Sequence, residues 1–387
     1  MKVYIVQNIE KIEPFYKEAR DFLIRNKKLS VLQNEALESL DLVPTIVKDF
    51  SEISDENEYV VFGNNLYFEP GLLREFIKRS RKMNSPTVCA VRNGIFTKRT
   101  FVNTQDIKKV DGHIEYKLWY FPKTPFIKST KPVIFDLDTN LENLLMPRHI
   151  LKEREYLIPA TPYPIIQINH WSNVWAANLI SIFSDVYRMQ NESKIKLFMH
   201  ALETISFNRW NIAGRMNKIG KNCDIHHTAY IEASTIGNNV VIAAGAVVRE
   251  SVIGNGTVIG NGVTVETSTI GDECTILNGH ILYSVVYSGL LSVTHMISAS
   301  VIGNNCFIGS GVVLTDFRMD GKTMHVIKDN KKIDTENVFL GACLGENVYL
   351  GANCVVAPGR SVPNNSRISL EKNKIINKSP FTGFRMS

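Results

Sequence analysis

Ile219-Gly220-Lys221-Asn222-Cys223 begins the pattern that decides the fold of the second half of this chain. An aliphatic residue, a glycine, two variable residues and a small residue recur with a constant period, and further copies begin at Ile236, Ile253 and Ile270. Two more apolar series share this spacing: Ile225, Ile242, Ile259 and Ile276, then Ile231, Val248, Val265 and Leu282. Three apolar starts per period predict three short strands per coil, with side chains stacked in three internal ladders. We therefore expect a left-handed parallel β-helix over residues 216–370.

The repeat is interrupted in two places. Ile302-Gly303 comes earlier than two full periods after Ile270, which predicts that two residues are missing between Leu282 and Ile297. The segment after Leu314 has no repeat and is predicted to be a hairpin arm over residues 315–337. Irregularities in a solenoid cluster where ligands bind, although many are neutral insertions.

These repeats resemble those of the hexapeptide-repeat acyltransferases and of the bifunctional sugar-1-phosphate nucleotidyltransferase/acyltransferases. The resemblance covers about 150 residues of the chain. It implies a homotrimer in which the sites for acetyl-CoA, or another acyl-CoA, lie between neighbouring subunits. It also implies a sugar or a sugar-nucleotide as the acceptor of the acyl group.

Residues 1–157 alternate strand-like and helix-like segments. Tyr59–Phe62, Thr87–Val91 and Ile114–Phe121 are predicted strands, and a helix is predicted to begin at Pro70. This order predicts an α/β domain with Rossmann-like layers and a largely parallel sheet. Residues 158–215 are predicted to be a Pro-rich linker and a helical connector, and residues 371–387 a basic tail.

The segment from Val61 to Leu73 resembles the part of sugar nucleotidyltransferases in which an Asp holds the catalytic Mg²⁺. Asn64 occupies that position here, and a neutral amide binds a hard cation less well than a carboxylate does. Residues 7–11 replace the family's Gly-rich phosphate loop, and residues 29–37 lack its Lys. We therefore expect a degenerate nucleotidyltransferase-like domain that binds no metal.

Asp136 and Asp138 follow an apolar strand, and this pattern has three interpretations. It is compatible with a metal-binding pair as in glycosyltransferases, or with the nucleophile strand of a haloacid dehalogenase-type phosphatase. The favoured interpretation is structural: Asp138 or Thr139 caps a predicted helix over Leu141–Leu145.

His295 lies at the interruption of the repeat, where the resemblance implies the general base of acyl transfer. The acyltransferase motif has a Tyr and a Gly-Asp pair that are missing here. Asp316, Arg318 and Lys322 follow, where the family has a polar segment, and are the predicted residues for binding acyl-CoA or acceptor. A structural role for His295 at a coil corner is the alternative, and His280 is interpreted as a stacked corner residue.

Composition excludes several classes of protein. The net charge of +6 is spread along the chain, so no nucleic-acid partner is expected. The N-terminus is expected to be a strand and not a signal peptide, and no membrane span is expected because no apolar run is long enough for one. Trp171–Met189 has the spacing of an amphipathic helix. Cys223, Cys274, Cys306 and Cys354 occupy the small positions of the repeat, which favours free thiols and a cytoplasmic location.

Two classes of function follow. The first is acyl transfer, with acetyl as the expected group, from CoA to a sugar or sugar-nucleotide, with the N-terminal domain as a non-catalytic acceptor platform. The second is a non-catalytic trimeric scaffold or regulator that has lost both chemistries. An active sugar-1-phosphate nucleotidyltransferase is the remaining alternative.

Overall fold

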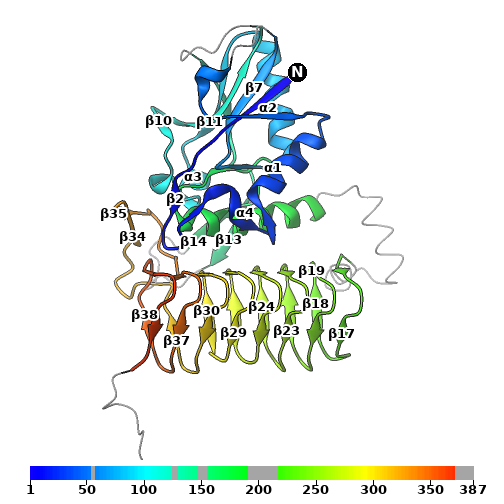
Figure 1. Ribbon diagram of the computed structural model, residues 1–387, viewed down its shortest axis with the longest axis vertical. Helices are drawn as coiled ribbons and strands as arrows, with labels where there is room; N and C mark the ends of the chain where they lie inside the picture. Colours follow the sequence, from blue (N-terminus) through cyan, green and yellow to red (C-terminus); the bar gives the residue numbers. More distant parts are fainter. Residues whose placement is uncertain (54–56, 124–129, 146–154, 191–215, 371–387) are drawn as a thin grey trace, which may run out of the picture.

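The computed structural model describes residues 1–53, 57–123, 130–145, 155–190 and 216–370. An N-terminal α/β part stands on one face of a long β-helix, and helix α4 (Trp171–Gln190) lies between the two (Figure 1). The predicted basic tail and the second half of the predicted helical connector lie outside the described residues.

The N-terminal part is built on a mixed sheet in the order β12-β9-β11-β7-β1-β6, with β10 added at β11. The strands are β1 (Lys2–Val6), β6 (Pro44–Val47), β7 (Tyr59–Gly63), β9 (Thr87–Arg92), β10 (Lys108–Val110), β11 (His113–Phe121) and β12 (Lys131–Phe135). The α/β class is confirmed. The sheet is less parallel than predicted, because β11 runs antiparallel to both β7 and β9.

The helices of this part are α1 (Leu29–Glu38), α2 (Pro70–Met83) and α3 (Ile95–Arg99). Helix α2 begins at Pro70 as predicted and ends at Asn84, which has the left-handed conformation that terminates helices. The smaller elements are β2 (Lys11–Ile12), β3 (Lys17–Glu18), β4 (Leu23–Ile24), β5 (Lys27–Lys28), β8 (Leu66–Phe68), β15 (Ile165–Gln167) and 3₁₀ turns at Ala19–Asp21, Phe50–Glu52 and Val102–Thr104.

The prediction of a helix over Leu141–Leu145 is wrong. That segment is strand β13 (Leu141–Leu145), which pairs antiparallel with β14 (Glu155–Pro159). The first residues of the predicted Pro-rich linker therefore belong to a hairpin, because the buried Tyr156 and Ile158 alternate with more exposed neighbours as a half-buried strand requires.

The C-terminal half is the predicted left-handed β-helix, and within the described residues its strands form three parallel sheets, here called faces 1, 2 and 3. Face 1 comprises β16 (Lys218–Ile219), β19 (Thr235–Ile236), β22 (Val252–Ile253), β25 (Thr269–Ile270), β28 (Val285–Val286), β31 (Val301–Ile302), β36 (Cys343–Leu344) and β39 (Ser361–Val362). Face 2 comprises β17 (Asp224–Ile225), β20 (Val241–Ile242), β23 (Val258–Ile259), β26 (Thr275–Ile276), β29 (Leu291–Ser292), β32 (Phe307–Ile308), β37 (Tyr349–Leu350) and β40 (Arg367–Ile368). Face 3 comprises β18 (Tyr230–Glu232), β21 (Val247–Arg249), β24 (Thr264–Glu266), β27 (His280–Leu282), β30 (Met296–Ser298), β33 (Val313–Leu314) and β38 (Val355–Val356).

The two missing residues are not where the sequence predicted them. Thr264 pairs with His280 and then with Met296, so two successive coils are each one residue shorter than the coils before them. Each of these coils loses its residue at the corner between faces 2 and 3. Consequently Ile281, which is 1% exposed, occupies the third internal ladder in place of the predicted Leu282.

The predicted hairpin arm is confirmed and docks on the N-terminal part as a strap, formed by β34 (His325–Lys328) and β35 (Lys331–Asp334) (Figure 1). Asp329 and Asn330 form its turn, and both have positive φ as a tight two-residue hairpin requires. Lys328 Nζ lies 2.6 Å from a carboxylate oxygen of Asp106, and Asn337 hydrogen-bonds to Lys98 and Arg99 of the N-terminal part.

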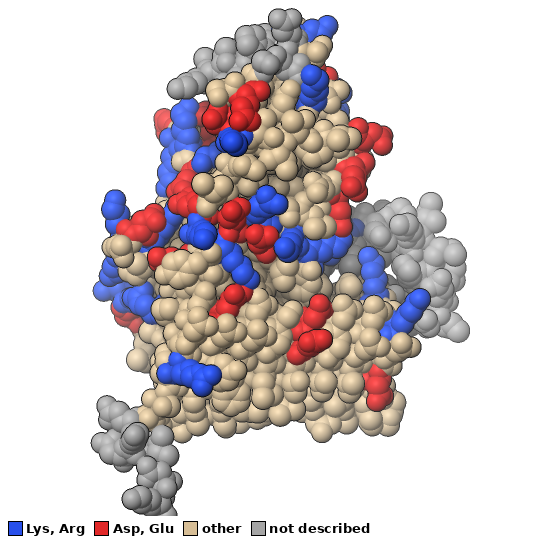
Figure 2. Space-filling view, viewed as in Figure 1, with Lys and Arg blue, Asp and Glu red and all other residues tan. Residues whose placement is uncertain are grey.

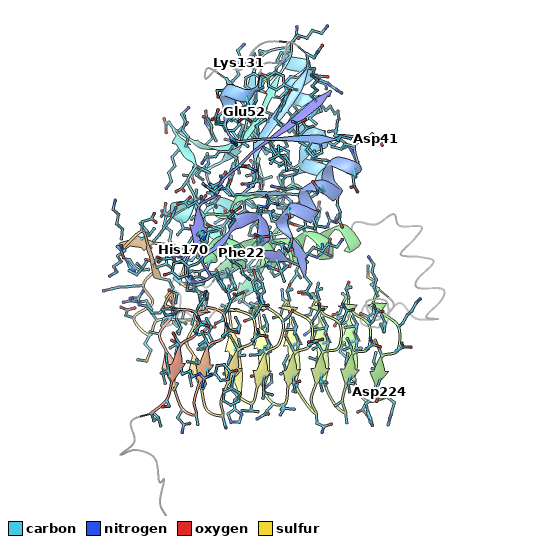
Figure 3. All side chains as sticks on the ribbon, viewed as in Figure 1. Phe22, Asp41, Glu52, Lys131, His170 and Asp224 are labelled. Atoms are coloured by element: carbon cyan, nitrogen blue, oxygen red, sulfur yellow. The ribbon has the colours of Figure 1, made fainter. Side chains whose placement is uncertain are left out.

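The part of face 1 from β25 to β36 is buried by the N-terminal part. Outward-facing Val285, Val301 and Cys343 belong to the same hydrophobic cluster as Phe15 and Phe22 of the N-terminal part. Figure 3 shows Phe22 and His170 at this boundary. A shared core of this kind fixes the two parts against each other.

Candidate functional site

His295 is exposed at the second shortened corner, between β29 and β30. Its Nδ1 lies 3.2 Å from the side-chain nitrogen of Asn278, which belongs to the first shortened corner. The two shortened corners therefore place an imidazole and a carboxamide side by side on adjacent coils. Sequence reasoning found His295 but not Asn278. No signal in the sequence located Asn278, because a residue count gives the total shortening but not the corner at which each residue is lost.

Gly279 supports the backbone of this corner. Its φ is +93°, and a Cβ there would lie 2.4 Å from the carbonyl oxygens of both Thr294 and His295. Any side chain at Gly279 would therefore displace the backbone that carries His295. The hydroxyl of Thr294 donates to the carbonyl of Val312 on the next coil, which fixes the same corner from the other side.

Partly exposed apolar side chains lie on the coil of His295 and on the two coils beside it. Leu277, Leu291, Met296 and Val313 are between 39% and 51% exposed. In Figure 2 the visible side of the β-helix has few charged side chains, whereas the N-terminal part has many. Partly exposed aliphatic side chains on neighbouring coils suit a surface that a partner or ligand covers.

The other predicted site residues do not meet His295. The hydroxyl of Ser298 donates to Asp316 at 2.6 Å, and the Cα atoms of Ser298 and His295, three residues apart on an extended strand, are about 10 Å apart. Arg318 forms an ion pair with Asp320, and this contact lowers the pKa of the Asp320 carboxyl. The backbone of Lys322 donates to the same carboxylate. Arg318 is thus paired within its own loop.

Asn64 has a structural role in the N-terminal part. Its side-chain oxygen accepts from the Asn8 backbone N–H at 2.8 Å, and its side-chain nitrogen donates to the Asn8 carbonyl at 3.3 Å. Both ends of the amide therefore hold the loop after β1. That this domain binds no metal remains a prediction.

Asp136 and Asp138 do not converge on a common point. Both oxygens of Asp138 accept at 2.7 Å from backbone N–H groups at the start of α3, those of Ile95 and Phe96. Asp136 lies 3.3 Å from Arg92. The predicted cap is wrong as stated, because Leu141–Leu145 is a strand and not the helix that Asp138 was expected to cap. Asp138 instead caps α3, which the pairing of β12 with β9 brings close to it. No group of three potential metal ligands occurs among the described residues.

A cavity of about 470 Å³ lies at the carboxyl ends of β1 and β7. Gln7, Asn8, Asn65, Lys117 and Trp119 are among the residues that line it. Strands β6 and β7 follow each other in the chain but flank β1 on opposite sides. The strand order therefore reverses at β1, and open α/β sheets bind ligands at such a switch point. The N-terminal part therefore keeps a cavity with amide, ammonium and indole groups, without a phosphate-binding glycine loop.

Residues 211–295 match the GMPPB C-terminal domain, a hexapeptide-repeat domain of sugar nucleotidyltransferases. The C-terminal half is a hexapeptide-repeat β-helix. No curated protein matches the chain significantly.

Three solved structures are similar to part of the chain. A hexapeptide transferase family protein from Anaplasma phagocytophilum is 22% identical over 40% of this chain and 78% of its own, with a TM-score of 0.20. The acetyltransferase domain of PglB from Neisseria gonorrhoeae, in complex with acetyl coenzyme A, is 14% identical over 38% and 53%, with a TM-score of 0.17. A GDP-perosamine N-acetyltransferase mutant from Caulobacter crescentus, in complex with CoA and GDP-perosamine, is 12% identical over 39% and 53%, with a TM-score of 0.15.

Helices with the length and hydropathy of a membrane span are absent from the described part of the chain.

Proposed function

We propose that this protein transfers an acyl group from CoA to a hydroxyl or amine of a sugar or sugar-nucleotide, with His295 as general base. The observation that supports this most is the pairing of exposed His295 with Asn278 at the two shortened corners. The two shortenings bring a titratable ring beside a polar group that can orient it.

In this proposal His295 removes the proton from the acceptor while the acceptor's oxygen or nitrogen attacks the thioester carbon. The carbon–sulfur bond then breaks, and the proton passes from His295 to the leaving CoA thiolate. For Nε2 to act as the base, Nδ1 must hold the proton and donate it to the Asn278 side-chain oxygen. The Asn278 side-chain nitrogen now faces Nδ1, and a half-turn of the amide, whose two ends have nearly the same shape, brings the oxygen there instead.

In this proposal the chain works as a trimer, and a neighbouring copy covers the surface around His295. His295 is exposed on the single chain, and general acid–base catalysis of acyl transfer needs a site that excludes bulk water. The exposed side chains of Leu277 and Leu291, on the side of the corner toward face 2, favour coverage by a neighbouring β-helix, as in the trimer that the sequence resemblance implies. Asp316 and Lys322 remain the proposed contacts for donor or acceptor at the edge of this surface.

The N-terminal part is proposed as the acceptor platform. Its 470 Å³ cavity has hydrogen-bonding groups suited to a sugar or a nucleobase. Asn64 is engaged by the loop after β1, so nucleotidyl transfer is not proposed.

The experiment is a thiol-release assay with acetyl-CoA and octanoyl-CoA as alternative donors and a panel of hexosamines, amino-sugar nucleotides and their hydroxy counterparts as acceptors. Acceptor-dependent CoA release supports acyl transfer. Tight binding of a sugar-nucleotide without CoA release for any acceptor, measured by calorimetry, would instead support the non-catalytic scaffold.

A further inference from the structure

A second cavity, of about 450 Å³, lies between face 3 of the β-helix and the N-terminal part. Leu282, Met296 and Val313 line it from face 3, and Trp175 of α4 and Tyr156 of β14 line it from the N-terminal side. Cavities that hold small molecules in proteins have volumes of about 300–1,000 Å³. This cavity is therefore large enough for a ligand or a part of one.

The chemistry of its walls selects the kind of ligand. The lining residues are mainly aliphatic and aromatic, and Asp316 is the one charged side chain among the described residues that line it. A carboxylate repels the phosphates of a nucleotide or of CoA itself. An aliphatic chain suits such walls, because each buried methylene contributes favourable transfer free energy.

The position of the cavity connects it to His295. Met296, which lines the cavity, is the next residue after His295 and the first residue of β30. Ser298, at the other end of β30, also lines it and is held by Asp316 at 2.6 Å. The cavity therefore begins beside the proposed base and extends along β30 toward α4.

We propose that this cavity binds the aliphatic chain of the acyl donor, so that the transferred group is a medium-length acyl group in preference to acetyl. This inference rests on the proposed acyl transfer and defines its donor. With the thioester carbon beside His295, the chain would run along face 3 past Met296 and Val313 toward Trp175. A hydroxyl or amide N–H on the chain would find an acceptor in the Asp316 carboxylate.

The test compares the dissociation constants of acetyl-CoA and octanoyl-CoA by calorimetry. Octanoyl-CoA has six more methylenes than acetyl-CoA, and each fully buried methylene tightens binding by about fourfold, which sets an upper limit of about 4,000-fold. Because the walls of the cavity are partly exposed, we expect octanoyl-CoA to bind about 100-fold more tightly. Val313→Phe fills part of the cavity and should lower this ratio by about tenfold or more. Val247→Phe is the matched control, because Val247 is also the first residue of a face 3 strand but does not line the cavity.

The outcomes separate the two proposals. An octanoyl-to-acetyl ratio near one, an equal effect of Val313→Phe and Val247→Phe, or no binding of either thioester overturns the acyl-chain site. If acetyl and octanoyl groups are transferred equally well, the proposed function stands and this inference is removed. Chain-length-dependent binding without CoA release for any acceptor supports the apolar site and removes the catalytic proposal.

Discussion

His170 should make the protein less stable in mild acid. Its imidazole is 3% exposed at the boundary between the N-terminal part and the strap. The backbone N–H of Ser172 lies 3.2 Å from Nδ1, so Nδ1 accepts and Nε2–H donates to the carbonyl of Ile327 on β34, also at 3.2 Å. Burial, with a smaller effect of the nearby Lys328 ammonium, lowers the pKa of His170 to about 3, although the Ile327 carbonyl opposes this.

The sign of the effect follows from where the proton binds. The pKa of His170 is about 3 in the folded protein and 6.5 in the unfolded chain. Below pH 6.5 His170 binds a proton in the unfolded chain but stays neutral in the folded protein. The stabilisation is thus fully present above the unfolded pKa and is lost as the pH falls toward the folded pKa. Between about pH 7.5 and about pH 5 this loss amounts to about 2 kcal/mol of unfolding free energy, at about 1.36 kcal/mol per pH unit.

Urea unfolding of the parent protein, His170→Gln and His280→Gln at both pH values measures this difference. Gln keeps a side-chain N–H to donate to Ile327 but cannot take up a proton. The parent and the exposed-site control His280→Gln should each lose about 2 kcal/mol more than His170→Gln on acidification. If all three proteins lose the same free energy between the two pH values, His170 is not held neutral in the folded state and the reasoning is refuted.

Further predictions concern the strap, the corner glycine and assembly. Lys328→Met should speed proteolytic cleavage of the strap several-fold, because it removes the contacts with Asp106 and Thr104, whereas Lys331→Met on the exposed side should not. Gly279→Ala should abolish acyl transfer by displacing the His295 backbone. The control is Gly262→Ala: Gly262 has a φ of +64° and no atom within 4 Å of an added Cβ, so this variant should cost only about 1 kcal/mol of stability. Equal activities of the two variants would contradict the role given to Gly279. Light scattering coupled to size exclusion should give a trimer, and a monomer at micromolar concentration would remove the intersubunit site. Pyrophosphate release from any nucleoside triphosphate and a hexose-1-phosphate should not exceed the no-enzyme background.

The repeat predicted the β-helix and the strap because both depend on local, periodic information. Inward residues such as Ile253 and Ile270 recur at a fixed spacing, and Asp329-Asn330 marks the turn of a two-residue hairpin. The predicted free cysteines also agree with the structure, where all six thiols are unpaired. Cys274 is an example: it is buried in the prism, and burial raises the pKa of its thiol to about 11, so the reactive thiolate is disfavoured.

The errors came from features that depend on contacts distant in sequence. A count of residues between Ile270 and Ile302 gives the total shortening but cannot divide it between corners, so Leu282 was assigned the inward position that Ile281 occupies. Leu141–Leu145 has apolar residues compatible with a helix or a strand, and its pairing with β14 decides for the strand. Asn278 and His295 are well separated in sequence and meet only because neighbouring coils stack.

The rate of acceptor-dependent CoA release by His295→Ala, measured beside His280→Ala and the parent protein, tests the central claim most directly. Both variants remove an exposed imidazole from face 3 or its corner, and circular dichroism and light scattering check that fold and assembly are unchanged. The account predicts that His295→Ala lowers turnover by about 10² to 10⁴, the usual contribution of a general base, while His280→Ala stays close to the parent. Equal turnover in the two variants would contradict the account.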